Sequence, residues 1–372
     1  MRAAPVALVL AVVAGQAAPA AGQTAPDAAP AAGSSAERPA PAPTKVQYSD
    51  HAMGTTITVW MWTADERAAA QGAEAVFNEM KRLDREMTNW EPRKEPGMPD
   101  IAPSEVVLIN RAAGGKPVKV SAETYAVIER AVDISKRSNG LFDITVGAFK
   151  GMWKFDDDLD GTLPDPSDVK KRLALVSWKD IALDARQRTV LLRRKGMSIT
   201  LGGIAKGYAV DKCVEILRKR GFKDFMMQAG GDMYIAGKKG NEPWMVAIRD
   251  PRGPASSYFA TAPIENHSFS TSGDYERGFV KDGVRYHHIL DPRTGQPAHA
   301  SRSVTIRAKD AFTADAWSKV LFIMGPKDAL ALVQREKLAD FDVVWVDDQN
   351  RVVMTDGIRP ALHLLKHPTP GP

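Results

Sequence analysis

Two adjacent histidines, His287 and His288, stand in the stretch YHHILDPRTG at residues 286–295. Neighbouring side chains of an extended strand point to opposite sides, so only one of these imidazoles can face a given site. Asp291, Arg293 and a turn-forming Pro/Gly combination follow closely, which favours proton transfer or phosphate binding by one histidine. The alternative is a histidine that only packs in the core.

A glycine-rich stretch at residues 202–211, GGIAKGYAVD, could bind an anion. Glycines let the backbone approach a ligand closely, and a helix that begins at the end of the stretch presents N–H groups to negative charge. Lys206 could add a full positive charge. The spacing matches neither the P-loop nor the dinucleotide-binding glycine pattern, so an ordinary glycine turn is an equal alternative.

Two further stretches combine hydroxyl and charged side chains. In STSGDYER at residues 270–277, the hydroxyls and Arg277 could hold phosphate oxygens, although the stretch alone is also typical of a turn. Asp315, Ser318 and Lys319 would fall on neighbouring turns of a helix. A carboxylate and a hydroxyl on one helical face can hold Mg²⁺. The alternative is a capped helix start with an Asp–Lys pair.

The elements that would position these residues are a mixture of helices and strands. Helices are expected where apolar residues recur every three or four positions or follow a capping residue. They are the stripe Ala73, Val76, Met80, Leu83 and Met87, the segment that Ser121 caps and Asn139-Gly140 ends, and residues 209–220 and 312–324. Strands are expected at residues 46–61 (with Met53-Gly54-Thr55-Thr56 inside), 189–193, 225–228, 244–248 and 341–346. Irregular alternation of the two indicates an α/β or α+β enzyme.

The composition excludes several classes of protein. Lys and Arg total 50 against 45 Asp and Glu, and the net charge of +5 is scattered along the 372 residues. Without a basic stripe, nucleic-acid binding is not expected, whereas an anionic small ligand is compatible. The single cysteine, Cys213, excludes an internal disulfide framework and a Cys-based metal site. No apolar run reaches the ~20 residues of a membrane span.

The N-terminal residues predict export. Arg2 is followed by the apolar run 6–14 and then by small residues up to Ala21, the three-part pattern of a cleavable signal peptide. The predicted organisation is a signal peptide at residues 1–22, a disordered Ala/Pro-rich linker at 23–44 and one folded domain at 45–366. A periplasmic location follows from the signal peptide.

Taken in this order, the motifs resemble those of the ApbE family, the FAD:protein FMN transferases that act on bacterial exported and membrane-bound flavoproteins. The resemblance covers roughly residues 48–325. Several collinear motifs are far more specific than any one of them. The matching motifs are Met53-Gly54-Thr55, GLFDITVG at 140–147, the stretch 202–211, AGGD at 229–232, TSGDY at 271–275 and the stretch 286–295.

The resemblance implies a T-fold-related α/β (α+β) flavin transferase domain with FAD as its substrate. It also implies Mg²⁺ at the diphosphate and transfer of FMN, through a phosphoester bond, to a Thr or Ser hydroxyl of a partner protein, with release of AMP. The acceptor would be an exported or membrane protein. Such a reaction needs neutralised phosphoryl oxygens and an oriented nucleophile.

The same resemblance implies roles for individual residues. His288 matches the catalytic histidine and would assist removal of the proton from the acceptor hydroxyl, while His287 is expected to point into packing. Ala205, through its carbonyl, and Asp315 match the metal ligands. The positions that match residues lining FAD are Met53, Trp90, Leu141, Phe142, Asp143, Tyr208, Thr271, Ser272, Gly273 and Ile289.

Two positions depart from the family pattern. Thr200 stands where the family usually has an Asp, and Lys319 stands where the metal helix usually has a Thr. An ammonium cannot coordinate a cation. Lys319 could occupy the metal's place, or swing away while Ser318 supplies a hydroxyl, or mark a protein that binds FAD without transferring FMN. An FAD pyrophosphatase that gives FMN and AMP is the remaining alternative function.

Overall fold

The structure is a computed structural model that describes residues 41–92, 101–155, 158–338 and 340–371. The predicted signal peptide and most of the predicted linker lie outside these residues, so both stay predictions. The first strand, β1 (Thr44–Ala52), begins where the linker was expected to end. None of the helices in these ranges combines the length and the apolar character that crossing a membrane requires.

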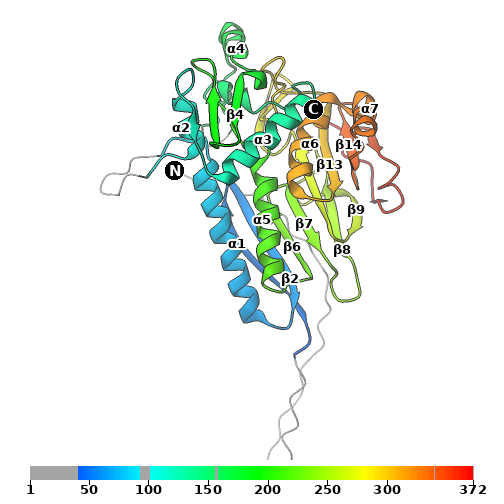
Figure 1. The fold of residues 1–372 in the computed structure, drawn as a ribbon. Helices are drawn as coiled ribbons and strands as arrows, with labels where there is room; N and C mark the ends of the chain where they lie inside the picture. The colour runs from blue at the N-terminus through cyan, green and yellow to red at the C-terminus, as the bar shows by residue number, and fades with distance from the viewer. Residues whose placement is uncertain (1–40, 93–100, 156–157, 339, 372) are drawn as a thin grey trace, which may run out of the picture.

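An eight-stranded antiparallel sheet forms the centre of the fold (Figure 1). Its strands follow the order β1-β2-β6-β7-β10-β13-β14-β15. The middle of β2 and the whole of β14 are buried on both faces, which shows that the sheet is covered on both sides. The strands after β1 are β2 (Thr55–Thr63), β6 (Phe225–Ala229), β7 (Asp232–Ala236), β10 (His267–Gly273), β13 (Ser301–Ala308), β14 (Asp342–Asp347) and β15 (Val352–Met354).

Helices cover one face of this sheet (Figure 1). They are α1 (Glu66–Met87), α5 (Ala205–Lys219) and α6 (Ala311–Met324), with α3 (Ala122–Arg137) packed beside α6. The predicted apolar stripe of α1 is buried in the main core, as an amphipathic helix requires. The predicted cap of α3 is also confirmed, because the Ser121 hydroxyl accepts a hydrogen bond from the Thr124 N–H.

A smaller three-stranded sheet covers the opposite face, in the order β16-β9-β8. Its strands are β8 (Trp244–Arg249), β9 (Tyr258–Ile264) and β16 (His363–Leu364). A second core joins apolar side chains of this sheet, such as Phe259, to Trp60 of the central sheet. The central sheet is therefore held between helices on one side and strands on the other.

The remaining elements form smaller units around the central sheet. A hairpin joins β11 (Gly278–Lys281) to β12 (Val284–His287), and a third sheet has the order β3-β5-β4. Its strands are β3 (Val118–Lys119), β4 (Ile181–Asp184) and β5 (Thr189–Leu192). The other helices are α2 (Glu105–Arg111), α4 (Pro166–Leu173), α7 (Pro326–Glu336) and the 3₁₀ helices η1 (Ile144–Phe149) and η2 (Trp178–Asp180).

Two predicted elements are wrong in ways that affect the candidate site. The single strand expected at residues 46–61 is a hairpin of β1 and β2, which turns at Met53 and Gly54 with φ angles of 52° and 67°. The helix expected to begin at Ala209 begins at Ala205, because apolar spacing alone does not mark the first turn. Lys206, Gly207 and Tyr208 are therefore helical residues and not part of a loop.

Candidate functional site

The first turn of α5 packs directly against α6, and a glycine makes this contact feasible. A Cβ atom added to Gly207 would lie 2.2 Å from the carbonyl oxygen of Ala311 and 2.7 Å from Cβ of Asp315. The Gly207 N–H donates to Oδ2 of Asp315 over 2.8 Å. Asp315, which is completely buried, is thereby fixed beside the start of α5, where Ala205 is the first helical residue.

Lys319 lies one helical turn after Asp315, and its ammonium contacts Oδ1 of that carboxylate. The Lys319 side chain is only 17% exposed. Burial alone would lower the pKa of Lys319, but the carboxylates of Asp315 and Asp232 raise it above its ordinary value. Burial alone would raise the pKa of Asp315, but Lys319 and Lys206 hold it below its ordinary value.

Asp232, at the start of β7, completes this charged cluster. It is 3% exposed, and Nζ of Lys206 lies 3.7 Å from its Oδ2. Burial and the neighbouring charge of Asp315 raise the pKa of Asp232 to about 6, although Lys206 and Lys319 oppose the shift. Two carboxylates and two ammonium groups from α5, α6 and β7 thus neutralise one another.

The residues present do not fit a Mg²⁺ ion at Asp315. One carboxylate oxygen contacts an ammonium and the other accepts an N–H, whereas Mg²⁺ requires oxygen ligands in a near-octahedral arrangement. The Ser318 hydroxyl contacts the Asp315 carbonyl and Oγ of Ser272, each over 2.7 Å. Among the residues that the structure describes, no group of three or more His, Cys, Asp or Glu side chains could hold a metal.

The strand β10 contributes Thr271, Ser272 and Gly273 in three different ways. Ser272 connects β10 to α6 through its bond with Ser318, and the hydroxyl of Thr271 lies 2.9 Å from that of Thr305 on β13. A Cβ atom added to Gly273 would lie 2.4 Å from the ring of Tyr275. The two hydroxyls therefore have partners within the protein.

The paired histidines occupy two different environments, as the sequence predicts. His287 is 1% exposed, its Nε2 donates to the Ala298 carbonyl over 2.7 Å, and its Nδ1 accepts from the Ile289 N–H over 3.3 Å. Burial lowers the pKa of His287 to about 4. His287 is therefore a neutral packing residue, and Ile289 is buried in the main core beside it.

His288 is half-buried, and its Nδ1 lies 3.3 Å from the Arg277 carbonyl. Because a carbonyl oxygen only accepts, Nδ1 carries the hydrogen and the lone pair is on Nε2. Burial, followed by the positive charge of Arg277, lowers the pKa of His288 well below its ordinary value. A neutral His288 with its lone pair on Nε2 can accept a proton.

Asp291, which follows the paired histidines in the sequence, is paired with Arg293. Its carboxylate accepts from the backbone N–H of Arg293 over 2.9 Å and from the guanidinium of the same residue over 2.7 Å. This pairing closes the turn that contains Gly295, whose φ angle is 70°. Asp291 therefore shapes the loop after His288.

In the segment Leu141–Asp143, a buried aromatic side chain lies against the glycine turn at Gly202 and Gly203. Leu141 and Phe142 are 6% and 5% exposed, and a Cβ atom added to Gly203 would lie 3.3 Å from the Phe142 ring. Burial raises the pKa of Asp143, whose oxygens accept from the N–H and hydroxyl of Thr145 and from the N–H of Trp178. Asp143 therefore caps η1, and Phe142 lies closest to the turn.

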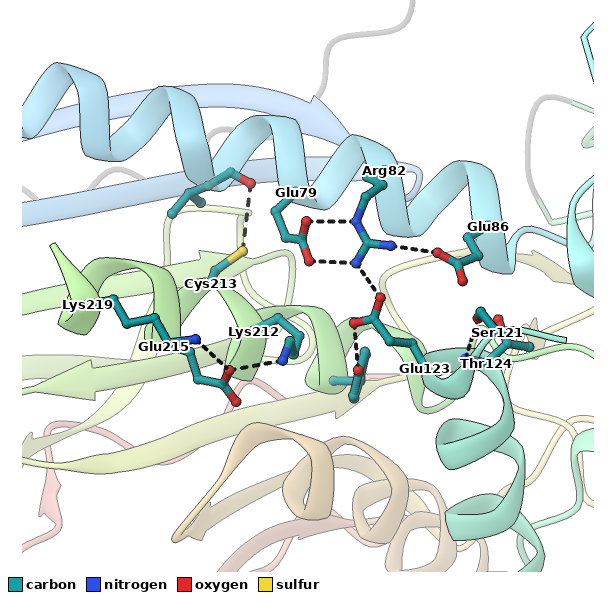
Figure 2. Close-up of polar contacts among 12 residues, drawn as sticks. Glu79, Arg82, Glu86, Ser121, Glu123, Thr124, Lys212, Cys213, Glu215 and Lys219 are labelled. Carbon is teal, nitrogen blue, oxygen red and sulfur yellow. Dashed lines mark hydrogen bonds and ion pairs between the residues drawn. The ribbon is translucent and has the colours of Figure 1, made fainter. Parts of the chain in front are cut away.

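Tyr208 is fixed by a network of charges that the sequence analysis missed. Its hydroxyl donates to Oε1 of Glu123 over 2.8 Å, and burial raises its pKa. Figure 2 shows Arg82 between Glu79 and Glu86 on α1, with Glu123 reaching it from α3 at 2.6 Å. The i, i+3 and i, i+4 spacing on α1 could have revealed part of this network, whereas no local pattern points to Glu123.

Met53 and Trp90 lie at the ends of the elements that carry them. Met53 is half-buried in the turn between β1 and β2, and its N–H donates to Asp84 over 2.7 Å. Trp90 follows α1, is 54% exposed and has the Lys150 ammonium 4.6 Å from its ring centroid. Direct contacts link Gly207, Asp315, Ser318 and Ser272. No hydrogen bond or ring contact connects Trp90 to that cluster within the described residues.

The fold and the cluster define a mixed helix and strand protein with a partly buried cluster of paired charges at a helix start. The chain belongs to the ApbE family, because the family model matches residues 53–344. The expected resemblance and the expected ApbE-like α/β (α+β) fold are thereby confirmed.

Several relatives align with most of this chain. An FAD:protein FMN transferase of Klebsiella pneumoniae is 32% identical over 311 residues, which are 83% of this chain and 91% of the relative. One of Treponema pallidum is 33% identical over 277 residues, covering 70% and 76%. The solved ApbE protein of Thermotoga maritima has a TM-score of 0.75 and 32% identity, covering 86% of this chain and 99% of that protein. The flavin transferase ApbE of Vibrio cholerae, at 24% identity and a TM-score of 0.73, shares the fold over 86% of this chain and 99% of its own.

Proposed function

We propose that this chain is an FAD:protein FMN transferase. The relatives of that name align with most of it. The observation that carries the proposal is the half-buried His288, whose Nε2 holds a lone pair while Lys206 and Arg277 act on it electrostatically. A base next to fixed positive charge is the combination that phosphoryl transfer to a hydroxyl requires.

In the proposed reaction, the oxygen of an acceptor Thr or Ser attacks the phosphorus on the FMN side of the FAD diphosphate. The new P–O bond joins FMN to the protein, and the bond from that phosphorus to the bridging oxygen breaks, so that AMP leaves. His288 Nε2 takes the proton of the hydroxyl. Lys206, Arg277 and Lys319 stabilise the negative charge on the phosphoryl oxygens.

The low pKa of His288 suits this role once FAD is bound. Burial and nearby cations keep the imidazole neutral in the free protein, so its lone pair is available at neutral pH. An anionic diphosphate at these cations offsets their positive charge and raises the pKa of the imidazole, which makes it a stronger base. Binding of the substrate therefore prepares the proton acceptor.

The proposed FAD pocket is lined by the residues that the family resemblance implies. Aromatic and thioether side chains suit the flat isoalloxazine and adenine rings. Glu123 holds Tyr208 through a hydrogen bond, and the main core holds Phe142. Both fixed rings support the assignment of these residues to the FAD lining. Asp143 would act through the turn that it caps. The remaining members of the proposed lining are Met53, Trp90, Leu141, Thr271, Ser272, Gly273 and Ile289.

The location and the acceptor belong to the same proposal. The signal pattern of residues 1–22 supports export to the periplasm, where an exported or membrane flavoprotein would be the acceptor. The intact mass of protein from the periplasmic fraction tests this, since cleavage should occur shortly after residues 18–22. A cytoplasmic pool that retains Met1 would contradict the prediction.

Two other functions compete, and Lys319 is the observation that favours the first of them. Its pairing with Asp315 removes the expected metal ligand, which would suit a protein that binds FAD without transferase activity. The other is an FAD pyrophosphatase, in which water replaces the acceptor hydroxyl and FMN and AMP are released. Mg²⁺, which the family resemblance implies, has no role in the steps proposed above, because Asp315 does not fit it.

Incubation of the protein with FAD and a candidate acceptor distinguishes the three functions. A transferase gives an acceptor band with flavin fluorescence on a denaturing gel, together with AMP. AMP without acceptor labelling indicates the pyrophosphatase. FAD binding without either product indicates a binding protein and overturns the proposal.

A further inference from the structure

The pairing of Lys319 and Asp315 is far less exposed than another helical pair of the same spacing. Lys219 and Glu215 on α5 form a helical pair of the same i, i+4 spacing, at 3.9 Å, with side chains 79% and 50% exposed. The Lys319 and Asp315 side chains are 17% and 0% exposed. A buried ion pair loses hydration on both partners and is weak evidence of a stabilising role. The position of Lys319 therefore needs another reason.

The aliphatic end of Lys319 lies against the glycine turn that leads into α5. A Cβ atom added to Gly203 would lie 3.9 Å from Cε of Lys319 and 3.3 Å from the Phe142 ring. The next charges are Lys206, on the first turn of α5, and Arg277, which acts on both Lys319 and His288. Lys319 thus brings a fixed cation to the place where the proposed diphosphate meets its proton acceptor.

Charge balance shows why a divalent ion is unnecessary here. Asp315 and Asp232 are the buried carboxylates of the cluster, and Lys319 and Lys206 already neutralise them. A divalent ion would add two positive charges beside two ammonium groups and would have to displace Lys319 from Asp315. Because its carboxylates are already paired with ammonium groups, the cluster has no acidic surplus that would attract such an ion.

We propose that Lys319 replaces a divalent cation at the FAD diphosphate, so that this chain binds FAD and transfers FMN without Mg²⁺. The inference rests on the proposed function, since it assigns the charge that stabilises the same transition state. The bonds made and broken are those given above, and the ammonium neither gains nor loses a proton.

Wild-type protein supplies the first test. Isothermal titration of FAD in excess chelator and in excess Mg²⁺ should give dissociation constants that agree within about twofold. Titration of Mg²⁺ alone into the free protein should give no binding heat. FAD binding that appears only with Mg²⁺ would overturn the inference and leave the transferase proposal intact, whereas no FAD binding in either buffer would overturn the transferase proposal.

The variant Lys319→Thr supplies the second test, with Lys219→Thr as the matched control. In chelator, Lys319→Thr should weaken FAD binding by about tenfold or more, the size of one lost contact to a charged group. Mg²⁺ should restore its affinity, because Asp315 is now free to take a metal. Lys219→Thr should behave as wild type in both buffers.

Equal Mg²⁺ dependence in wild type and Lys319→Thr would show that Lys319 lies outside the diphosphate site, which overturns the inference. Circular dichroism establishes whether Lys319→Thr folds. If it does not fold, the wild-type titrations decide the question alone.

Discussion

At the scale of single residues, His287 and His288 differ in what their ring nitrogens contact. Both nitrogens of His287 have backbone partners, so its ring is fixed and neutral. Only Nδ1 of His288 has a hydrogen-bond partner among the described residues, which leaves the lone pair of Nε2 for an incoming hydroxyl. Of the two histidines, only His288 therefore suits the proposed proton transfer.

His288→Ala should reduce the rate of FMN transfer by about 10²–10⁴, because a general base is removed. FAD affinity should change little, since the imidazole is not proposed to anchor the flavin. Single-turnover transfer and FAD titration on the same preparation measure the two effects. His363→Ala, an exposed histidine on β16, is the control. Equal loss of FAD binding and of transfer in His288→Ala would contradict the assignment.

His287 should make the stability of the fold pH-dependent. Its folded pKa of about 4 lies below the ordinary value of 6.5, so the unfolded chain binds more protons between these values. This contribution to stability is present above pH 6.5 and is lost as the pH falls toward 4, by about 3 kcal/mol at most.

Urea unfolding of wild type and His287→Gln across this range isolates the effect. The variant should show a smaller loss of unfolding free energy on acidification, because glutamine keeps a donor and an acceptor but does not titrate. Parallel curves for the two proteins would show that His287 does not contribute to the acid sensitivity.

At the scale of elements, the close approach of α5 and α6 positions Asp315. Gly207→Ala should destabilise the fold by about 1–3 kcal/mol, since its new methyl group would overlap Ala311 and push the helices apart. Gly202→Ala is the steric control, because its Cβ would lie 3.6 Å from Thr200, its nearest neighbour. Thermal unfolding compares the two, and equal melting temperatures would contradict the close packing.

The observed helices and strands also show which parts of the fold can be predicted from the sequence. The stripe of α1 and the cap of α3 are predictable, because apolar period and side-chain capping are local signals. The turn at Met53 was missed, since the residues on both sides of it are β-branched and read as one continuous strand. The start of α5 was missed because its first turn lies inside a glycine stretch.

At the scale of the whole molecule, the site depends on pairings that are distant in sequence. Gly207 meets Asp315, Ser272 meets Ser318, and Glu123 meets both Arg82 and Tyr208. Single motifs predict that these residues are chemically useful, but they do not predict which of them neutralise one another. The Lys319–Asp315 contact was one of three outcomes that the sequence left open.

The measurement that tests the central claim most directly is the intact mass of an acceptor protein after incubation with this chain and FAD. The proposed acceptor is an exported or membrane flavoprotein with a Thr or Ser hydroxyl at its flavin attachment site. We expect the mass to rise by one phosphoester-linked FMN, with one AMP released for each FMN attached and with no gain when His288→Ala replaces wild type. An unchanged acceptor mass, with wild-type protein that binds FAD, would contradict the assignment as a transferase.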